Sequence, residues 1–233
     1  MEESRLRQSC RQSSRKARGP VDSVNAEIVL IRHGTTDSNN RGLLHGRTDT
    51  PLASKGIEQA SLVASRLARL EDVHAVYSSP LVRARTTAEL IASQTGLTPM
   101  IDPDLREFDF GDLEGVTFED LQVRFPAVYS SLFDPDGFDH PFPNGESRRS
   151  IYERVSQSLD RITSASGSGR VIVVAHLIVI ASAVARLTSD NPDDAINYLV
   201  ENCSVTRLRL NGKSPAELIE LNDVDHLKDT ERA

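Results

Sequence analysis

The sequence predicts an α/β fold, a three-layer sandwich in which helices flank a mostly parallel central sheet. Residues 27–31 and 171–174 are short, continuous apolar runs rich in β-branched side chains, which is typical of strands buried on both faces. Stretches between such runs, of which residues 54–70 are the clearest, repeat apolar side chains at helical spacing. Strands that alternate with helices along a chain favour parallel pairing, with helices covering both faces of the sheet.

The composition is that of a globular protein with a single domain. The chain has 233 residues, of which 38% are hydrophobic and 26% are charged. Its formal net charge is −7, because 34 Asp and Glu outnumber 27 Lys and Arg. Proteins that bind nucleic acid usually carry a basic excess, so this balance argues against nucleic acid as a partner. It still permits a local basic pocket for an anionic substrate.

Residues 1–25 differ from the rest of the chain. They are basic, rich in Ser and Gln and poor in large apolar side chains, so we expect a disordered tail before a folded domain over residues 26–233. The longest apolar runs are far shorter than a membrane span. Cys10 and Cys203 are too few and too far apart for a disulfide framework. We therefore expect a cytoplasmic protein that has no membrane partner.

The first half of the domain can be assigned in order. A strand over 27–31 is followed by a helix over 54–70, for which Ser54 is the expected N-cap. A second strand covers 73–78, and a helix begins near Pro80 and ends at about residue 95, before Gly96. Residues 105–115 form an acidic loop with glycines, and a short helix covers about 117–125.

The second half continues the alternation of helix and strand. A loop rich in Pro, Gly and Asp covers 133–145, and we expect it to form part of the pocket cover. Ser147 opens a helix that carries Ile151, Val155, Leu159 and Ile162 on one face. The strand over 171–174 precedes helices over 178–187 and 192–200. Strands over 204–210 and 217–221 complete the sheet.

Basic side chains follow three of the predicted strands. Arg32 and His33 end the first strand, Arg83 follows the second, and His176 follows the strand over 171–174. Taken singly, each is more often a structural histidine or a solvated charge than a functional residue. Ligands of such sheets bind beyond the carboxyl ends of the strands, so the convergence predicts a site for an anion. By spacing alone, the acid–base group of this site could be any of Glu107, Asp109, Asp112 and Glu114.

Several segments, taken together and in order, resemble the histidine phosphatase superfamily, the phosphoglycerate mutase-like proteins. The first is Arg-His-Gly-Thr-Thr-Asp-Ser-Asn over residues 32–39. The others cover residues 44–52, 55–60, 78–88, 105–115, 145–147 and 175–176. An isolated Arg-His-Gly would be a weak signal, but the ordered set is specific and spans about residues 27–222. The resemblance favours the phosphatase branch.

The resemblance implies a role for each matching residue. His33 is the nucleophile that forms a phosphohistidine, Arg32 and Arg83 clamp the phosphoryl group, and His176 donates a hydrogen bond to it. Glu107 protonates the departing alkoxide and later activates water. Further positions that match the pocket wall are Thr36, Asn39, His45, Gly46 and Leu177. No metal ion or other cofactor is implied.

Leu177 is a departure from the family pattern, which normally has small residues after the second histidine. Leu177 still offers a backbone N–H, but its side chain could crowd the pocket. The resemblance therefore implies a phosphomonoesterase for small phosphorylated metabolites, with two alternatives. One is a bisphosphoglycerate-dependent phosphoglycerate mutase, for which the 133–145 loop is short, and the other is a catalytically weakened, phosphate-binding regulatory member. By family analogy, the expected assembly is a homodimer.

Overall fold

A six-stranded sheet forms the centre of the computed structural model, which describes residues 26–210, 212 and 215–232. The predicted tail of residues 1–25 lies outside the described residues. The strand order is β3-β2-β4-β1-β5-β6. Strands β1 to β4 pair in parallel, whereas β5 is antiparallel to β1 and β6 to β5, so the sheet is mostly parallel as predicted. The strands are β1 (Ala26–Arg32), β2 (Val73–Ser78), β3 (Met100–Ile101), β4 (Gly169–Ala175), β5 (Val205–Leu210) and β6 (Glu217–Asp223).

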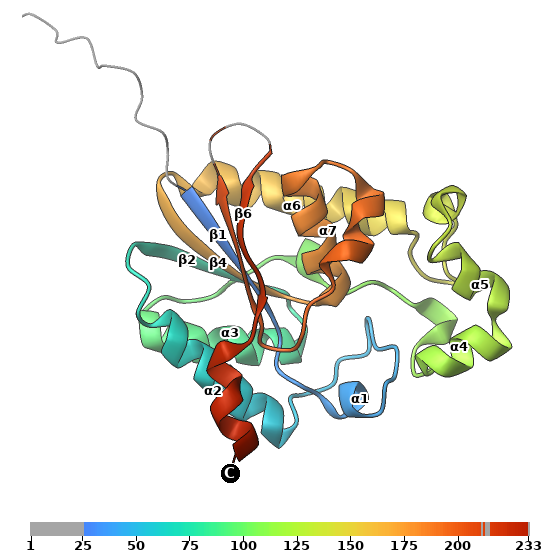
Figure 1. Cartoon of the computed structure of the whole chain (residues 1–233), viewed down its shortest axis with the longest axis horizontal. Coiled ribbons are helices and arrows are strands. Elements are labelled where there is room, and N and C mark those ends of the chain that lie inside the picture. The colour runs from blue at the N-terminus through green and yellow to red at the C-terminus, as the bar shows by residue number, and fades with distance from the viewer. Residues whose placement is uncertain (1–25, 211, 213–214, 233) are drawn as a thin grey trace, which may run out of the picture.

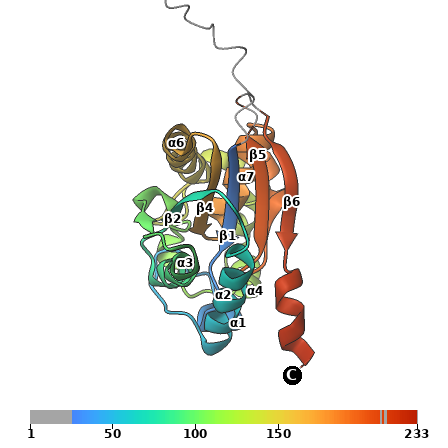
Figure 2. The same cartoon turned by 90° about the vertical axis from the view of Figure 1, so that its left-hand side faces the viewer.

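Helices cover both faces of this sheet, as Figures 1 and 2 show. One face carries α2 (Ser54–Leu67) and α3 (Val82–Thr95), and the other carries α6 (Arg148–Ser166) and α7 (Leu177–Thr188). Beside these layers lie α4 (Phe118–Arg124) and α5 (Pro126–Ser131), with the four-residue α1 (Asp37–Asn40) near the end of β1. The 3₁₀ helices are η1 (Pro103–Leu105), η2 (Gly111–Leu113), η3 (Pro135–Asp139), η4 (Pro192–Tyr198) and η5 (Asp225–Arg232).

The first strand shows how an apolar run serves both layers. Ile28 and Leu30 belong to the hydrophobic cluster under α6 and α7, whereas Val29 and Ile31 belong to the cluster under α2 and α3. All four side chains are buried, because successive residues of a strand point to opposite faces. This is why the run over 27–31 has no polar alternation in the sequence.

Most of the predicted elements are present, with local differences. Ser147 caps α6, as predicted, by accepting a hydrogen bond from the Ser150 N–H at 3.1 Å. The expected cap at Ser54 is wrong: the N-cap of α2 is Ala53, which makes no side-chain capping bond. The Ala53 N–H instead donates to the Thr35 carbonyl at 2.9 Å, so packing on the segment after β1 sets the start of this helix.

Other boundaries differ where tertiary packing or local hydrogen bonds decide the backbone. The helix expected near Pro80 begins at Val82, and the helix expected over 192–200 is the 3₁₀ helix η4. The 133–145 stretch is not all loop, because it contains η3. Elements that the sequence did not predict are β3, α1 and α5, the longest of which has six residues.

The topology brings the ends of three parallel strands together. The His33 N–H, just after β1, donates to the Ala175 carbonyl of β4 at 3.0 Å. On the other side of β4, the Ser79 N–H donates to the Val174 carbonyl at 3.1 Å. The residues that follow β1, β4 and β2 therefore lie side by side at one edge of the sheet.

Candidate active site

Two histidines from adjacent strands face each other at this edge. His33 follows β1 and His176 follows β4, and their ring centroids lie 5.1 Å apart. His45, from the loop after α1, lies with its ring centroid 6.1 Å from that of His33. His33 and His176 are both buried. The predicted convergence of basic side chains beyond the strand ends is thus present in the fold.

The hydrogen bond of His33 fixes its tautomer. Its Nδ1 lies 2.7 Å from the Gly34 carbonyl, which can only accept, so Nδ1 carries the proton and Nε2 carries a free electron pair. Burial and the positive charges of Arg83 and Arg32 hold the pKa of His33 well below its usual range. The ring is therefore a neutral nucleophile in the correct tautomer without any substrate present.

His176 has the opposite arrangement, with one nitrogen held and the other unpartnered. Its Nε2 lies 2.8 Å from the Ser79 hydroxyl, which already accepts a hydrogen bond from the Leu81 N–H. The Ser79 O–H is thus free to donate to Nε2, which leaves the proton of the neutral ring on Nδ1. Burial, together with Arg83 and His33, keeps the pKa of His176 well below its usual range. Among the described residues, its buried Nδ1 has no hydrogen-bond partner.

Two arginines flank the histidines and are anchored by backbone carbonyls. Arg32 donates from one terminal nitrogen to the Val200 carbonyl at 2.6 Å. Arg83, which is completely buried at the start of α3, donates to the carbonyls of His45, Gly46 and Thr48 at 2.8–3.2 Å. The buried Nε atoms of both arginines have no partner among the described residues. Buried guanidinium groups with free N–H donors are typical of a site for an oxyanion.

Glu107 is the acidic residue that faces this cationic pair. Burial raises the pKa of its carboxyl group, while the Phe108 N–H and the charges of Arg83 and Arg32 act in the opposite direction. One carboxyl oxygen accepts from the Phe108 N–H at 2.9 Å, and the other lies 3.4 Å from the Ile178 N–H at the start of α7. A carboxyl group with a raised pKa beside a nucleophile is suited to general acid catalysis.

The other acidic residues of the loop have different contacts. Glu114 accepts from the backbone N–H groups of residues 46–48 at 2.9–3.2 Å and so holds the loop whose carbonyls anchor Arg83. Asp109 lies 3.6 Å from the Arg47 guanidinium, and Asp112 accepts from the Asn144 amide at 2.9 Å. The structure thus separates four acids that spacing alone could not distinguish.

Gly46 and His45 lie where the loop passes closest to Glu107's own segment. A Cβ at Gly46 would meet the Phe108 carbonyl at 1.7 Å, so a side chain cannot be accommodated there. His45 donates from Nδ1 to the Leu43 carbonyl at 3.2 Å, and burial together with the charge of Arg83 lowers its pKa to about 4. Its Nε2 lies 3.2 Å from the Thr36 hydroxyl, so His45 is also neutral and oriented.

Thr36 and Asn39 form a capping box that fixes the turn after His33. The Asn39 N–H donates to the Thr36 hydroxyl at 3.2 Å, and the Thr36 N–H donates to the Asn39 side-chain oxygen at 3.0 Å. The Asn202 amide, from the segment before β5, donates to the His33 carbonyl at 2.9 Å. Nothing in the sequence pattern indicated Asn202, because it is 169 residues from His33.

Leu177 is the first residue of α7, directly after His176, and it is half-buried against the apolar cluster under that helix. Its N–H belongs to the first turn, which has no acceptor within the helix, and faces the same edge of the sheet as His176. The structure thus keeps the backbone donor that the sequence predicted at this position.

A second residue set that the sequence left without a role holds the Glu107 segment in place. Arg154 of α6 donates to the carbonyls of Asp104, Arg106 and Glu107 at 2.6–3.0 Å. The same guanidinium pairs with Glu146 at 2.8 Å. Glu146 lies in the Gly-Glu-Ser motif, which was the available signal, but its partner Arg154 looks like an ordinary solvated charge in the sequence.

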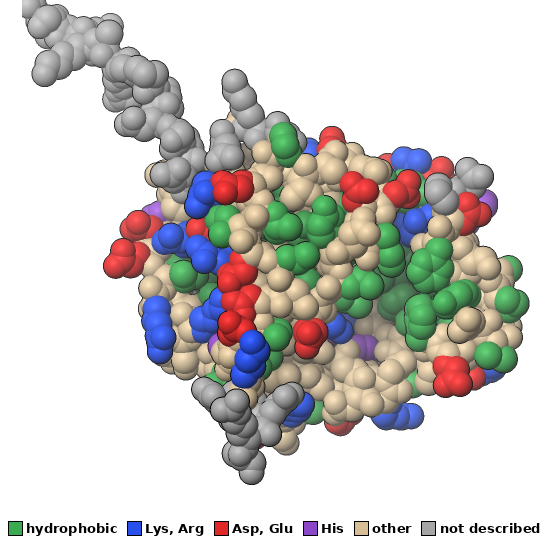
Figure 3. All heavy atoms as spheres, viewed as in Figure 1, with side chains coloured by type: hydrophobic (Ala, Val, Ile, Leu, Met, Phe, Trp, Pro, Cys, Tyr) green, Lys and Arg blue, Asp and Glu red, His purple; other side chains and the backbone are tan. Residues whose placement is uncertain are grey.

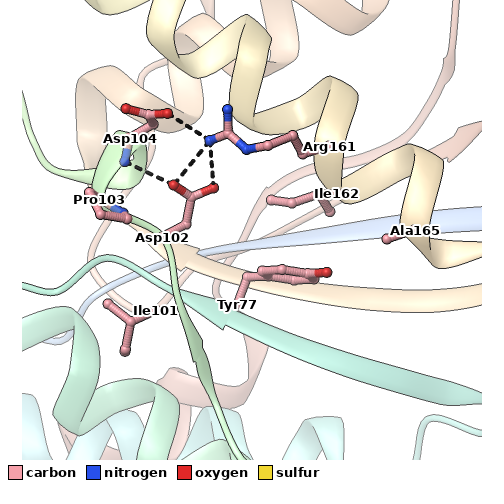
Figure 4. A pocket seen from close by; sticks show the side chains of 8 residues that line it. All are labelled: Tyr77, Ile101, Asp102, Pro103, Asp104, Arg161, Ile162 and Ala165. Carbon is pink, nitrogen blue, oxygen red and sulfur yellow. Dashed lines mark hydrogen bonds and ion pairs between the residues drawn. The ribbon is translucent and has the colours of Figure 1, made fainter.

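A separate cavity of about 520 Å³ lies at the β3 edge of the sheet, away from the histidines (Figure 4). Its charged lining is already paired, because Arg161 contacts Asp102 at 3.1 Å and Asp104 at 2.6 Å. Within the described part of the chain, no cluster of His, Cys, Asp and Glu has the arrangement of a metal site. Across those same residues, no helix combines the length and apolarity needed to cross a bilayer. The chemistry is therefore best sought at the histidines.

Comparisons with known proteins agree with this geometry. The histidine phosphatase superfamily (branch 1) matches residues 28–224. The chain belongs to this superfamily. It is 35% identical over 207 residues to phosphoglycerate mutase-like protein 4 of Arabidopsis thaliana, a match that covers 88% of each chain. It is 36% identical over 170 residues to the metal-independent phosphoserine phosphatase of the same plant, covering 72% of this chain and 71% of that one.

A solved structure extends the superfamily assignment to three dimensions. The alpha-ribazole phosphatase from Shigella flexneri superposes with a TM-score of 0.72 at 32% identity, and the match covers 84% of this chain and 96% of that one. The matched family segment contains every candidate site residue from Arg32 to Leu177. The fold and recognition predicted from the sequence are thus confirmed, while the role of each residue stays a proposal.

Proposed function

We propose that this histidine phosphatase hydrolyses the phosphate monoesters of small metabolites through a phosphohistidine on Nε2 of His33. The observation that carries the proposal is a set of three buried donors without a partner among the described residues: Nε of Arg32, Nε of Arg83 and Nδ1 of His176. Buried donors are rarely left unpaired, and these three surround the free Nε2 of His33. A phosphoryl group with its oxygens on these donors would place phosphorus against that nitrogen.

The first step transfers the phosphoryl group to the protein. Nε2 of His33 attacks phosphorus, the P–O bond to the ester oxygen breaks, and Glu107 donates its proton to the departing alkoxide. Arg32, Arg83 and His176 stabilise the charge on the three remaining phosphoryl oxygens. In the second step, Glu107 takes a proton from water, the oxygen of which attacks the phosphohistidine. The P–N bond breaks, and inorganic phosphate and neutral His33 are formed.

Two features of the site are prepared before the substrate arrives. The Gly34 carbonyl fixes the His33 tautomer, so that no proton must leave before the attack. The raised pKa of Glu107 keeps its proton available for the leaving group. Fixed charges and hydrogen bonds of this kind lower the reorganisation energy of the transfer.

The test is a comparison of wild type with His33→Ala on phenyl phosphate. We expect wild type to release inorganic phosphate without priming and to give a phosphohistidine in an alkaline quench, detected by mass spectrometry. His33→Ala should lose at least about 10³-fold in kcat, or roughly 4 kcal/mol, because the covalent route is removed. A variant that hydrolyses nearly as fast as wild type would show that the nucleophile lies elsewhere.

The alternatives give different results in the same assay. A phosphoglycerate mutase would interconvert phosphoglycerates only after priming with a bisphosphate and would release little inorganic phosphate. A regulatory member that binds phosphate without turnover would give neither hydrolysis nor a phosphohistidine. We further propose that residues 26–233 are the phosphatase domain. A cytoplasmic location, a homodimer and the exclusion of nucleic acid stay predictions from the sequence.

A further inference from the structure

Hydrophobic side chains surround the entrance to the candidate active site. Figure 3 shows a hollow on this face with a histidine at its floor, and hydrophobic side chains gather on both sides of it, over α4 and α5 and over α7 and η4. The exposed large apolar residues of these elements and the short connections after them are Phe118, Val123, Phe133, Ile196 and Leu199, which are 47–74% exposed. An exposed apolar gathering beside a polar floor is typical of a ligand groove.

The wall on the α4–α5 side is a row of three aromatic rings. Tyr129 has its ring centroid 5.4 Å from that of Phe118 and 5.3 Å from that of Phe133. The row is joined to the site through its first member, because Thr117 pairs with Leu43, two residues before His45. A planar or aliphatic group next to the phosphoryl site would therefore find an aromatic surface on this side.

The opposite wall is joined to the site by its backbone. Leu199 directly precedes Val200, whose carbonyl accepts the hydrogen bond from Arg32 at 2.6 Å. Leu177 and Ile178, at the start of α7, are half-buried and follow His176 in the chain. The Ile178 N–H lies 3.4 Å from Glu107, the proposed donor of the proton to the leaving group. The leaving group must therefore pass between these aliphatic side chains and the aromatic row.

The arginines around this entrance are already held by other groups. Arg47 pairs with Glu146 at 3.1 Å and with Asp109 at 3.6 Å. Arg148 lies 3.7 Å from Asp193, and Arg149 pairs with Asp139. These pairings leave little positive charge to bind the carboxylate of a leaving group such as serine or glycerate.

From these observations we infer that the site selects phosphate monoesters whose alcohol part is apolar or aromatic, rather than compact carboxylated alcohols. The inference rests on the proposed function, since the phosphoryl group is what fixes the alcohol part against the apolar walls. The aromatic row and the aliphatic residues beside Arg32 and Glu107 form the specificity surface, and the buried arginines supply the same phosphate contacts for every substrate.

The experiment compares substrates that differ only in apolar surface. The alcohols of 2-phenylethyl phosphate and ethyl phosphate are of similar basicity, so the chemical step makes similar demands on Glu107. We expect kcat/KM to be at least about tenfold higher for 2-phenylethyl phosphate, from burial of the ring. O-Phosphoserine and 3-phosphoglycerate should be no better than ethyl phosphate. A preference for either carboxylated substrate over 2-phenylethyl phosphate would overturn the inference.

Variants locate the preference in the named walls. Phe133→Ser and Leu199→Ser should each reduce the ratio of the two kcat/KM values by about threefold to tenfold, with less effect on ethyl phosphate. The matched control is Ile219→Ser, which removes an aliphatic side chain that is 36% exposed on β6, an edge strand, and should leave the ratio unchanged. Equal ratios in all three variants and wild type would overturn the assignment of these walls.

Binding separates failure of this inference from failure of the proposed function. Calorimetry should give a lower Kd for 3-phenylpropylphosphonate than for propylphosphonate, neither of which can be hydrolysed. If wild type failed to hydrolyse phenyl phosphate, the proposed function would fall, but tighter binding of the phenyl phosphonate would still support an apolar entrance. Equal affinities would refute the inference and assign the apolar surface to a contact with another protein.

Discussion

Arg154 gives the most direct test of how the fold holds Glu107. Its guanidinium makes five hydrogen bonds, two to Glu146 and three to the carbonyls of residues 104, 106 and 107. Its side chain is only 14% exposed. We expect Arg154→Met to leave these three carbonyls unpaired and the Glu107 segment free to shift, while Glu146 keeps its contact with Arg47 at 3.1 Å.

The magnitude follows from burial of the pair. Removing one partner of a buried ion pair costs about 3–5 kcal/mol, and the remaining contacts of Glu146 place this case near the lower limit. For a chain of this size, a loss of about 3 kcal/mol lowers Tm by roughly 6–12 °C. The matched control is Arg161→Met on the same helix, because Arg161 also contacts the 102–104 segment but is 52% exposed. An exposed pair contributes at most about 1 kcal/mol, so this control should keep most of its Tm.

Activity distinguishes positioning of Glu107 from a general loss of stability. Below the Tm of the variant, kcat of Arg154→Met on ethyl phosphate should fall at least about tenfold, because the alkoxide needs a proton from Glu107. The loss on 4-nitrophenyl phosphate should be smaller, since its phenolate leaves without full protonation. The same loss on both substrates, together with a Tm equal to that of Arg161→Met, would refute the positioning role.

Three further predictions follow from the site and the core. Because the reaction requires neutral His33 and protonated Glu107, and the pKa of His33 is lowered while that of Glu107 is raised, kcat/KM for ethyl phosphate should hold at acidic pH and decline as pH rises through the Glu107 pKa; a Glu107→Gln profile that keeps this decline would contradict it. Gly34→Ala should lower Tm and activity together, since its Cβ would meet the Gly56 carbonyl at 2.3 Å and overpacking of backbone costs about 1–3 kcal/mol or more; an unchanged Tm would show that the two segments can separate freely. The pKa of Glu27 lies below its ordinary value, because its two arginine partners outweigh the effect of burial, so its stabilisation is complete above the unfolded pKa and is lost as pH falls through the folded pKa. Glu27→Gln should therefore reduce Tm at neutral pH and show a smaller deficit in acid, and a deficit independent of pH would assign the effect to packing alone.

The sequence predicted those parts of the fold that depend on local patterns. The strand over Val73–Ser78 has the predicted bounds, because an apolar run between polar turns is a local signal. The cap at Ser147 was predictable because a serine side chain reaches only the first turn of its own helix. The start of α2 was mispredicted for the complementary reason, since the decisive contact comes from Thr35, which lies outside the helix.

The candidate site was predictable as a set of residue types but not as a hydrogen-bond network. Strand ends and family-like motifs indicated His33, Arg83, Glu107 and His176, and the fold brings them together. Which atom of each side chain is occupied depends on backbone carbonyls that the sequence does not mark. Asn202, for example, contacts the His33 carbonyl from a segment without any motif. No local pattern encodes a contact between residues so far apart.

The charges of the site explain why these carbonyls matter. Arg32 and Arg83 bring two buried positive charges to a place where His33, His45 and His176 could each add another. The pKa of every one of these histidines is lowered, so the rings stay neutral and the arginines keep the charge. Carbonyls of residues 45–48 and 200 partly neutralise the guanidinium groups in the absence of ligand.

This partial neutralisation leaves the phosphoryl group a defined share of the binding energy. The carbonyls occupy terminal nitrogens of each arginine, and the Nε atoms remain for an incoming anion. A free pair of arginines could bind an anion in several orientations, but anchored guanidinium planes present their remaining donors in one direction. The loop that Glu114 holds is therefore as important for aligning phosphorus with Nε2 of His33 as the arginines themselves.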